Sequence, residues 1–169
     1  MAVRYVRGEG DEILSKKSKK VEVIDEKIKE LIADMIETMH KHEGIGLAAV
    51  QVGILRNLFV VDLYEEGTPP FVFINPEVLE EKGEQEVDEG CLSFPNKFAK
   101  IKRPKEITVR YLNEEGEKIT LKAKELLAQA ISHEVDHLNG IVFVEKMIPG
   151  TLEVVTEEEK QEKRKKDKK

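Results

Sequence analysis

The residues best suited to chemistry are two histidines and a glutamate in the pattern H-E-x-x-H, namely His133, Glu134 and His137. On a helix, residues four apart leave the same face, so both imidazoles could bind one metal ion. Glu134 lies about 100° round the helix from His133, close enough to act on water beside that metal. The pattern predicts a metal-dependent hydrolase. The alternative is that these residues lie on a solvated helix face. To support a hydrolase, the rest of the chain must supply a third ligand and an oxyanion site.

Cys91 is the best candidate for the third ligand. Residues 138–146 contain no histidine, and Glu145 is their only acid. His40 and His42 end an earlier predicted helix and are expected at the surface. Cys91 follows Gly90, where the backbone can approach closely, and a thiolate is a strong ligand for zinc and ferrous iron. A lone cysteine is otherwise a small buried hydrophobe.

An oxyanion site needs hydrogen-bond donors. The Gln51 side-chain amide and the backbone N–H of Leu92 are the candidates, although Gln51 could also be an ordinary polar loop residue. Gly44 and Gly46 would let a substrate backbone approach an edge strand. Their alternative role is a simple helix end and turn.

Two predicted helices frame these residues. Apolar residues recur every three or four positions from Lys27 to about His42, which predicts an amphipathic helix, and a second helix is expected from Lys124 to about Leu138. Strands are expected at 58–63, at 71–74 (ended by Asn75-Pro76), at 107–112 with a return at 118–122, and at 141–144, with a polar hairpin about Gly83 from 78 to 87. This order of elements predicts an α+β fold.

Length and charge favour one domain with a separate tail. The chain has 169 residues, and we expect a single catalytic domain over 1–150. Residues 151–169 are expected to be a charged tail, either helical or disordered. From Lys160 to Lys169 it carries seven basic residues against two acidic ones, which suits an anionic partner such as RNA or a solvated end. Abundant lysine and glutamate are compatible with heat adaptation.

The composition also excludes several classes. The N-terminus lacks an apolar signal-peptide region, and no apolar run is long enough to span a membrane. A single cysteine cannot form an intramolecular disulfide, so the sequence predicts a soluble cytoplasmic protein. The net charge of −6 gives no reason to expect DNA binding by the domain.

Three segments together resemble the signature motifs of the peptide deformylases, in that family's order and spacing. They are Gly44-Ile45-Gly46-Leu47-Ala48-Ala49-Val50-Gln51, Glu89-Gly90-Cys91-Leu92-Ser93 and His133-Glu134-Val135-Asp136-His137. The resemblance extends from about Gly10 to about Ile148. It implies mixed or antiparallel sheets around a central helix that carries H-E-x-x-H. It also implies removal of the N-formyl group from the initiator methionine of new proteins.

The resemblance implies roles for individual residues. Metal ligands are expected at Cys91, His133 and His137, the general base at Glu134, and oxyanion donors at Gln51 and Leu92; the substrate is expected to contact Gly44, Ile45, Gly46, Glu89, Leu126 and Ala130. Glu89 also falls where the family has a buried ion pair, here with Arg103. Ferrous iron is the expected native metal, with zinc, nickel or cobalt able to replace it.

Two positions depart from the family pattern. Ser132 stands where the family usually has glutamine, and Gln129 stands where an apolar pocket residue is common. Both departures concern the pocket rather than the ligands or the base. The short basic tail stands where some members have a longer helix implicated in ribosome docking, so ribosome contact is only an expectation. The other functions to be distinguished are an H-E-x-x-H metallopeptidase and a non-catalytic ribosome-associated metal-binding domain.

Overall fold

The structure, a computed structural model, describes residues 2–167 and consists of two antiparallel sheets and three helices. The helices are α1 (Glu26–Lys41), α2 (Glu125–Leu138) and α3 (Glu157–Asp167). The strands are β1 (Gly46–Ala48), β2 (Leu58–Val61), β3 (Phe71–Lys82), β4 (Gln85–Cys91), β5 (Phe94–Arg103), β6 (Glu106–Leu112), β7 (Lys118–Lys124) and β8 (Glu153–Val154). The predicted α+β class is confirmed.

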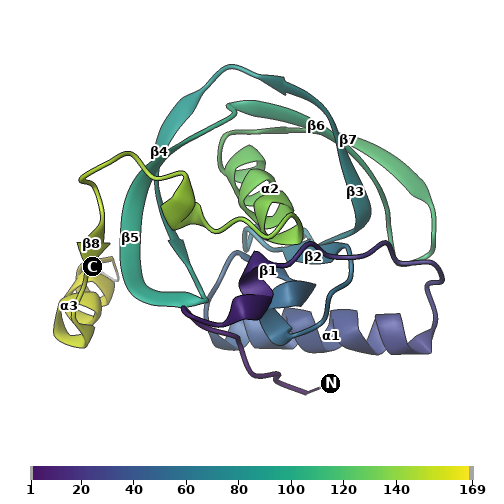
Figure 1. The fold of residues 1–169 in the computed structure, drawn as a ribbon, viewed down its shortest axis with the longest axis horizontal. Coiled ribbons are helices and arrows are strands. Elements are labelled where there is room, and N and C mark those ends of the chain that lie inside the picture. The colour runs from purple at the N-terminus through teal and green to yellow at the C-terminus, as the bar shows by residue number, and fades with distance from the viewer. Residues whose placement is uncertain (1, 168–169) are drawn as a thin grey trace.

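Helix α2 lies between the sheets, with α1 along the outer side of β1 and β2 (Figure 1). One sheet has the order β1-β2-β3-β6-β7 and the other β4-β5-β8, so β1 is an edge strand. Asp25 caps α1, its carboxylate accepting the N–H of Ile28 at 3.0 Å. Gly140, with φ 75°, follows the end of α2.

Strand β2 is a run of four apolar residues because both of its faces are covered. Phe59 and Val61 pack in the cluster that contains the α2 residues Ala130 and Ile131. Their neighbours Leu58 and Val60 pack instead in the cluster built around α1. Successive side chains of a strand point to opposite faces, so this short strand fixes α2 relative to α1.

The expectation that Asn75-Pro76 ends a strand is wrong. Strand β3 continues to Lys82, with a register shift between Ile74 and Glu77. Asn75 adopts φ 50°, donates its backbone N–H to the Asn57 carbonyl, and bonds Val21 through both side-chain amide atoms. Proline is tolerated at such a bulge because the ladder is already interrupted there.

Two further strand predictions are also wrong. Residues 78–87 do not form a hairpin, because β3 pairs with β6 while β4 pairs with β5 in the other sheet. Residues 141–144 form no strand; a single 3-10 turn, Phe143–Glu145, buries the Phe143 ring edge-on against Phe94 at 5.6 Å. Packing of that one aromatic side chain, rather than strand pairing, orders the segment after α2.

The C-terminal segment is partly ordered against the small sheet. Strand β8 pairs with β5 at Lys97 and Phe98, and α3 follows at the left edge of Figure 1. The last two lysines of the predicted tail lie outside the described residues. Within residues 2–167, no helix is long and apolar enough to cross a membrane.

Candidate metal centre and active site

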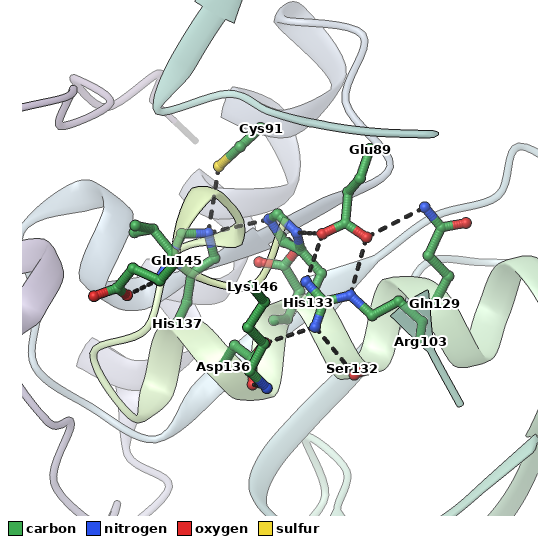
Figure 2. A network of polar contacts seen from close by, with 12 residues as sticks. Glu89, Cys91, Arg103, Gln129, Ser132, His133, Asp136, His137, Glu145 and Lys146 are labelled. Atoms are coloured by element: carbon green, nitrogen blue, oxygen red, sulfur yellow. Dashed lines mark hydrogen bonds and ion pairs between the residues drawn. The ribbon is translucent and has the colours of Figure 1, made fainter. Parts of the chain in front are cut away.

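Helix α2 and the end of β4 bring three donor atoms together. His133 and His137 are one turn apart, with their Nε2 atoms 3.1 Å from each other. Cys91, the last residue of β4, places its Sγ 3.3 Å from His137 Nε2. All three donor atoms lie within 4.8 Å of one another (Figure 2). The three residues predicted as metal ligands therefore meet at one point, although Cys91 comes from β4 and the two histidines from α2.

The surroundings of this triad fit a metal ion. The carboxylate of Glu89 binds His133 at Nδ1, which leaves Nε2 facing Cys91 and His137. A carboxylate behind a histidine in this way orients the ring and fixes its tautomer in metal sites. Two imidazoles and a thiolate suit zinc or ferrous iron and leave a coordination position open.

The two histidines differ in their electrostatic surroundings. Burial lowers the pKa of His137 well below its usual range, which favours the neutral form that a ligand requires. Burial also lowers the pKa of His133, but the charge of Glu134 and contacts with Cys91 and Glu89 outweigh burial and raise it. A divalent cation competes with that proton for the ring nitrogen.

A buried charged network supports the triad from behind (Figure 2). Arg103 donates to both carboxylate oxygens of Glu89, at 3.0 and 2.5 Å, and to Asp136 at 2.6 Å. Lys146 extends the network to Asp136 at 2.9 Å. Ser132, at the position that departs from the family pattern, accepts from Arg103 at 3.3 Å. Glu89 thus binds the nitrogen of His133 that faces away from the other two ligands. Its direct contact with substrate stays a prediction.

The Glu89 network predicts a loss of stability in acid. Burial raises the pKa of Glu89, but hydrogen bonds from His133 and Arg103 outweigh burial and lower it from 4.5 to about 2. The ionised form therefore stabilises the fold above pH 4.5, and this contribution is lost as the pH falls toward 2. We expect a loss of about 3 kcal/mol from this group.

Urea unfolding of chelator-treated protein at pH 6, 4 and 3 measures the part of this loss that falls above pH 3, about 2 kcal/mol. Chelation separates it from release of metal. Glu89→Gln should flatten the pH dependence. Glu86→Gln, at an exposed position of the same strand, is the matched control. An equal slope in wild type and Glu89→Gln would contradict the assignment.

Glu134 lies beside the metal triad and is buried, with 3% of its surface exposed. Burial, the largest cause, raises the pKa of its carboxyl from 4.5 to about 7. Its Oε1 is buried and has no hydrogen-bond partner among the described side chains and backbone. A carboxylate whose pKa lies near neutrality is suited to accept and return a proton.

Gly46 on β1 leaves the space that the Glu134 carboxylate fills. A Cβ at this position would lie 2.5 Å from Oε2 of Glu134, closer than two atoms can approach. Gly46→Ala should therefore displace the carboxylate and lower kcat/KM about 100-fold, since misplacements near 1 Å can cost that much. Gly8→Ala is the matched control because its added carbon would come no nearer than 3.8 Å to a neighbour. Activities within twofold of each other would contradict this account.

Gln51 is held with its amide nitrogen toward the triad. Its Oε1 accepts the backbone N–H of Ala48 at 2.9 Å, so the amide nitrogen points to the other side. There Nε2 donates to Ser93 Oγ at 3.0 Å and lies 3.5 Å from Cys91 Sγ. Ser93 was not predicted as a partner of Gln51, although it is the last residue of the motif that contains Cys91.

A cleft of about 530 Å³ opens beside the triad, and two of its members, Cys91 and His133, line it. Its lining includes every residue predicted to touch substrate: Gly44, Ile45, Gly46, Glu89, Leu126 and Ala130. Gln51, Leu92, His133 and Glu134 also line it. Residues 94–98 of β5 form a further part of the lining that was not predicted, because β5 itself was not predicted.

Comparison with known proteins agrees with this geometry. Residues 3–152 match the family model described as polypeptide deformylase. A peptide deformylase of Acetivibrio thermocellus is 55% identical over 148 residues, which are 88% of this chain and 85% of that protein. The crystal structure of peptide deformylase from Thermotoga maritima has 41% identity and a TM-score of 0.84, covering 88% of this chain and 100% of that one.

A class I type b peptide deformylase from Acinetobacter baumannii, bound to Met-Ala-Ser, has 32% identity and a TM-score of 0.82, covering 86% of this chain and 99% of that one. Peptide deformylases are metal-dependent hydrolases that remove N-formyl groups from peptides, which agrees with a Cys-His-His site beside a cleft. The chain belongs to the peptide deformylase family.

Proposed function

We propose that Cys91, His133 and His137 hold one divalent cation and that this centre removes the formyl group from N-formyl-methionyl peptides. The observation that carries the proposal is the convergence of these three donor atoms beside Glu134 and Gln51 in one cleft. Ferrous iron is the proposed native ion, and zinc, nickel or cobalt could replace it, since two imidazoles and a thiolate suit all four.

The substrate is proposed to lie along the edge strand β1. The open edge of β1 can accept an extended peptide as an added strand, with Ile45 and Gly46 as backbone partners. The methionine side chain would lie against Leu126, Ala130 and Ile45 at the cleft wall. Comparison with the Acinetobacter baumannii structure supports a peptide that begins with methionine.

The chain's own residues account for the proton and charge transfers. A bound divalent cation supplies Lewis acidity and lowers the pKa of water. Glu134 takes a proton from the attacking water, and the amide of Gln51 and the backbone N–H of Leu92 stabilise the negative charge that grows on the formyl oxygen. Glu134 then gives its proton to the leaving nitrogen as the C–N bond breaks. The products are formate and a free methionine amine.

The catalytic domain is proposed to be residues 1–150, with α2 as its central helix and α1 as its amphipathic N-terminal helix. Residues 151–169 are proposed as a tail that contacts the ribosome through its basic residues. Nascent chains bearing formyl-methionine are made in the bacterial cytoplasm, so we propose that the protein acts there.

Anaerobic purification followed by metal analysis and a formate-release assay tests the proposal. We expect about one equivalent of metal, release of formate from formyl-Met-Ala-Ser, and no cleavage of unformylated Met-Ala-Ser. Cleavage of the Met-Ala bond would indicate a metallopeptidase instead. Stoichiometric metal without formate release, at any loading with iron, zinc, nickel or cobalt, would indicate a non-catalytic domain.

A further inference from the structure

One wall of the cleft is a short segment whose conformation is held by residues that do not belong to the metal centre. We define this lip as residues 42–46, all of which line the cleft. It joins the end of α1 to β1, and Glu43 within it adopts the left-handed φ of 55°. The lip is therefore a strained connection that neighbouring contacts must hold in place.

The lip is fastened at both ends by its backbone. On the α1 side, the N–H of Gly44 donates to the Met39 carbonyl at 3.0 Å. On the β2 side, the N–H of Asp62 donates to the Ile45 carbonyl at 2.9 Å. The carbonyl of Gly44 lies between these two attachments.

Tyr64 binds that carbonyl. Its hydroxyl donates to the Gly44 oxygen at 2.6 Å, although the side chain as a whole is 51% exposed. Tyr64 itself adopts the left-handed φ of 57°, which is uncommon for an aromatic residue. A strained backbone and a short hydrogen bond across 20 positions of sequence indicate a residue with a specific task.

Asp62 and His40 hold Tyr64 in this conformation. One carboxylate oxygen of Asp62 accepts the backbone N–H of Tyr64 at 2.8 Å, and the other contacts Nε2 of His40 at 2.7 Å. The rings of His40 and Tyr64 lie 5.5 Å apart. His40 comes from the last turn of α1 and Asp62 follows β2, so the group connects both elements that flank the lip.

The opposite side of the lip packs on Leu92. A Cβ at Gly44 would lie 2.7 Å from Cδ1 of Leu92, so this glycine lies directly on that side chain. Gly44 is thus enclosed between the Tyr64 hydroxyl and the residue whose backbone N–H is the proposed oxyanion donor. Burial, Asp62 and Glu43 all raise the pKa of Tyr64, which keeps the phenol protonated and able to donate.

We propose that Tyr64, held by Asp62 and His40, is a positioning residue that presents the lip to the part of the peptide following the formyl-methionine. This inference rests on the proposed function, because it assumes a substrate lying along β1. The hydrogen bond between Tyr64 and Gly44 involves no metal ligand. Its loss should therefore weaken binding of the peptide chain more than it slows the chemical step.

Tyr64→Phe tests the inference because it removes only the hydroxyl. We expect KM for formyl-Met-Ala-Ser to rise about three- to tenfold, the range expected for one hydrogen bond, with kcat within about twofold. KM for formyl-Met-amide, which lacks the following residues but still contacts Ile45 of the lip, should rise less than KM for the tripeptide. Tyr5→Phe is the matched control, since Tyr5 is 79% exposed on the N-terminal arm.

The possible outcomes separate the two proposals. An unchanged KM for the tripeptide, or a fall in kcat equal for both substrates, would overturn the positioning role. A lower melting temperature with unchanged kinetics would assign Tyr64 to stability alone. If the wild-type protein released no formate from either substrate, the proposed function itself would fail, independently of Tyr64.

Discussion

Replacing Glu134 with Gln should lower kcat for formyl-peptide hydrolysis about 100- to 10,000-fold, the range that a positioned general base contributes. Glutamine has nearly the same shape but cannot accept the proton of water. Because the ligand atoms belong to other residues, metal content should stay at the wild-type level. The measurement is formate release together with metal analysis of the same preparation.

The pH dependence of wild-type activity tests the same assignment. Glu134 must be ionised to act as a base, so kcat/KM should rise with pH and be lost as the carboxyl becomes protonated. Burial raises the pKa of this carboxyl to about 7, and a bound cation nearby lowers it again. We therefore expect an acidic limb with a midpoint at or below about 7.

Glu125→Gln, at an exposed position at the start of the same helix, is the control for loss of one carboxylate from α2. It should retain wild-type turnover and the wild-type acidic limb. Formate release by Glu134→Gln at more than a tenth of the wild-type rate would contradict the role as base.

Local patterns in the sequence predicted α1 and α2 and most residues of the candidate site. The apolar spacing of 27–42 predicted α1 within one residue at each end, because that stripe packs on β1 and β2. The H-E-x-x-H spacing placed two imidazoles on one face of α2. Cys91 was found by elimination among few candidates, and the structure places its sulfur beside both rings.

The predictions failed where long-range contacts override local signals. Strand β5 was not predicted, because its buried side alternates Ala99, Ile101 and then a charged Arg103, which breaks the apolar pattern. The carboxylates of Glu89 and Asp136, distant in sequence, make burial of that charge tolerable. Asn75-Pro76 likewise has the composition of a turn, but the contacts of Asn75 with Val21 and Asn57 allow β3 to continue past it.

The lip could not be predicted for a related reason. His40 was expected to be an ordinary surface residue, and it is indeed exposed. Its partner Asp62 and the neighbouring Tyr64 lie more than 20 positions away, and nothing in their spacing links them to Gly44. Contacts of this kind depend on how α1 and β2 pack.

Replacing Arg103 with Met should lower the free energy of unfolding by about 3–5 kcal/mol, the usual cost of removing one partner from a buried ion pair. The Arg103 side chain is 1% exposed and contacts Glu89 and Asp136. Without it, Asp136 would keep only the ion pair with Lys146, and Glu89 would keep its contacts with His133 and Gln129, so two buried carboxylates would lose their shared arginine. Urea unfolding at pH 7 measures this change. Arg110→Met is the matched control: its ion pair with Glu77 is at the surface and should contribute at most about 1 kcal/mol.

The cause of this loss can be tested separately from its size. If excess negative charge destabilises Arg103→Met, adding Asp136→Asn should restore part of the lost stability, since one buried carboxylate is removed. If lost packing of the arginine stem is the cause, the double variant should be less stable than Arg103→Met.

Arg103→Met should also raise the pKa of Glu89, whose depression depends partly on that guanidinium. Glu89 would then orient His133 less firmly, so metal affinity should fall about 10- to 100-fold along with stability.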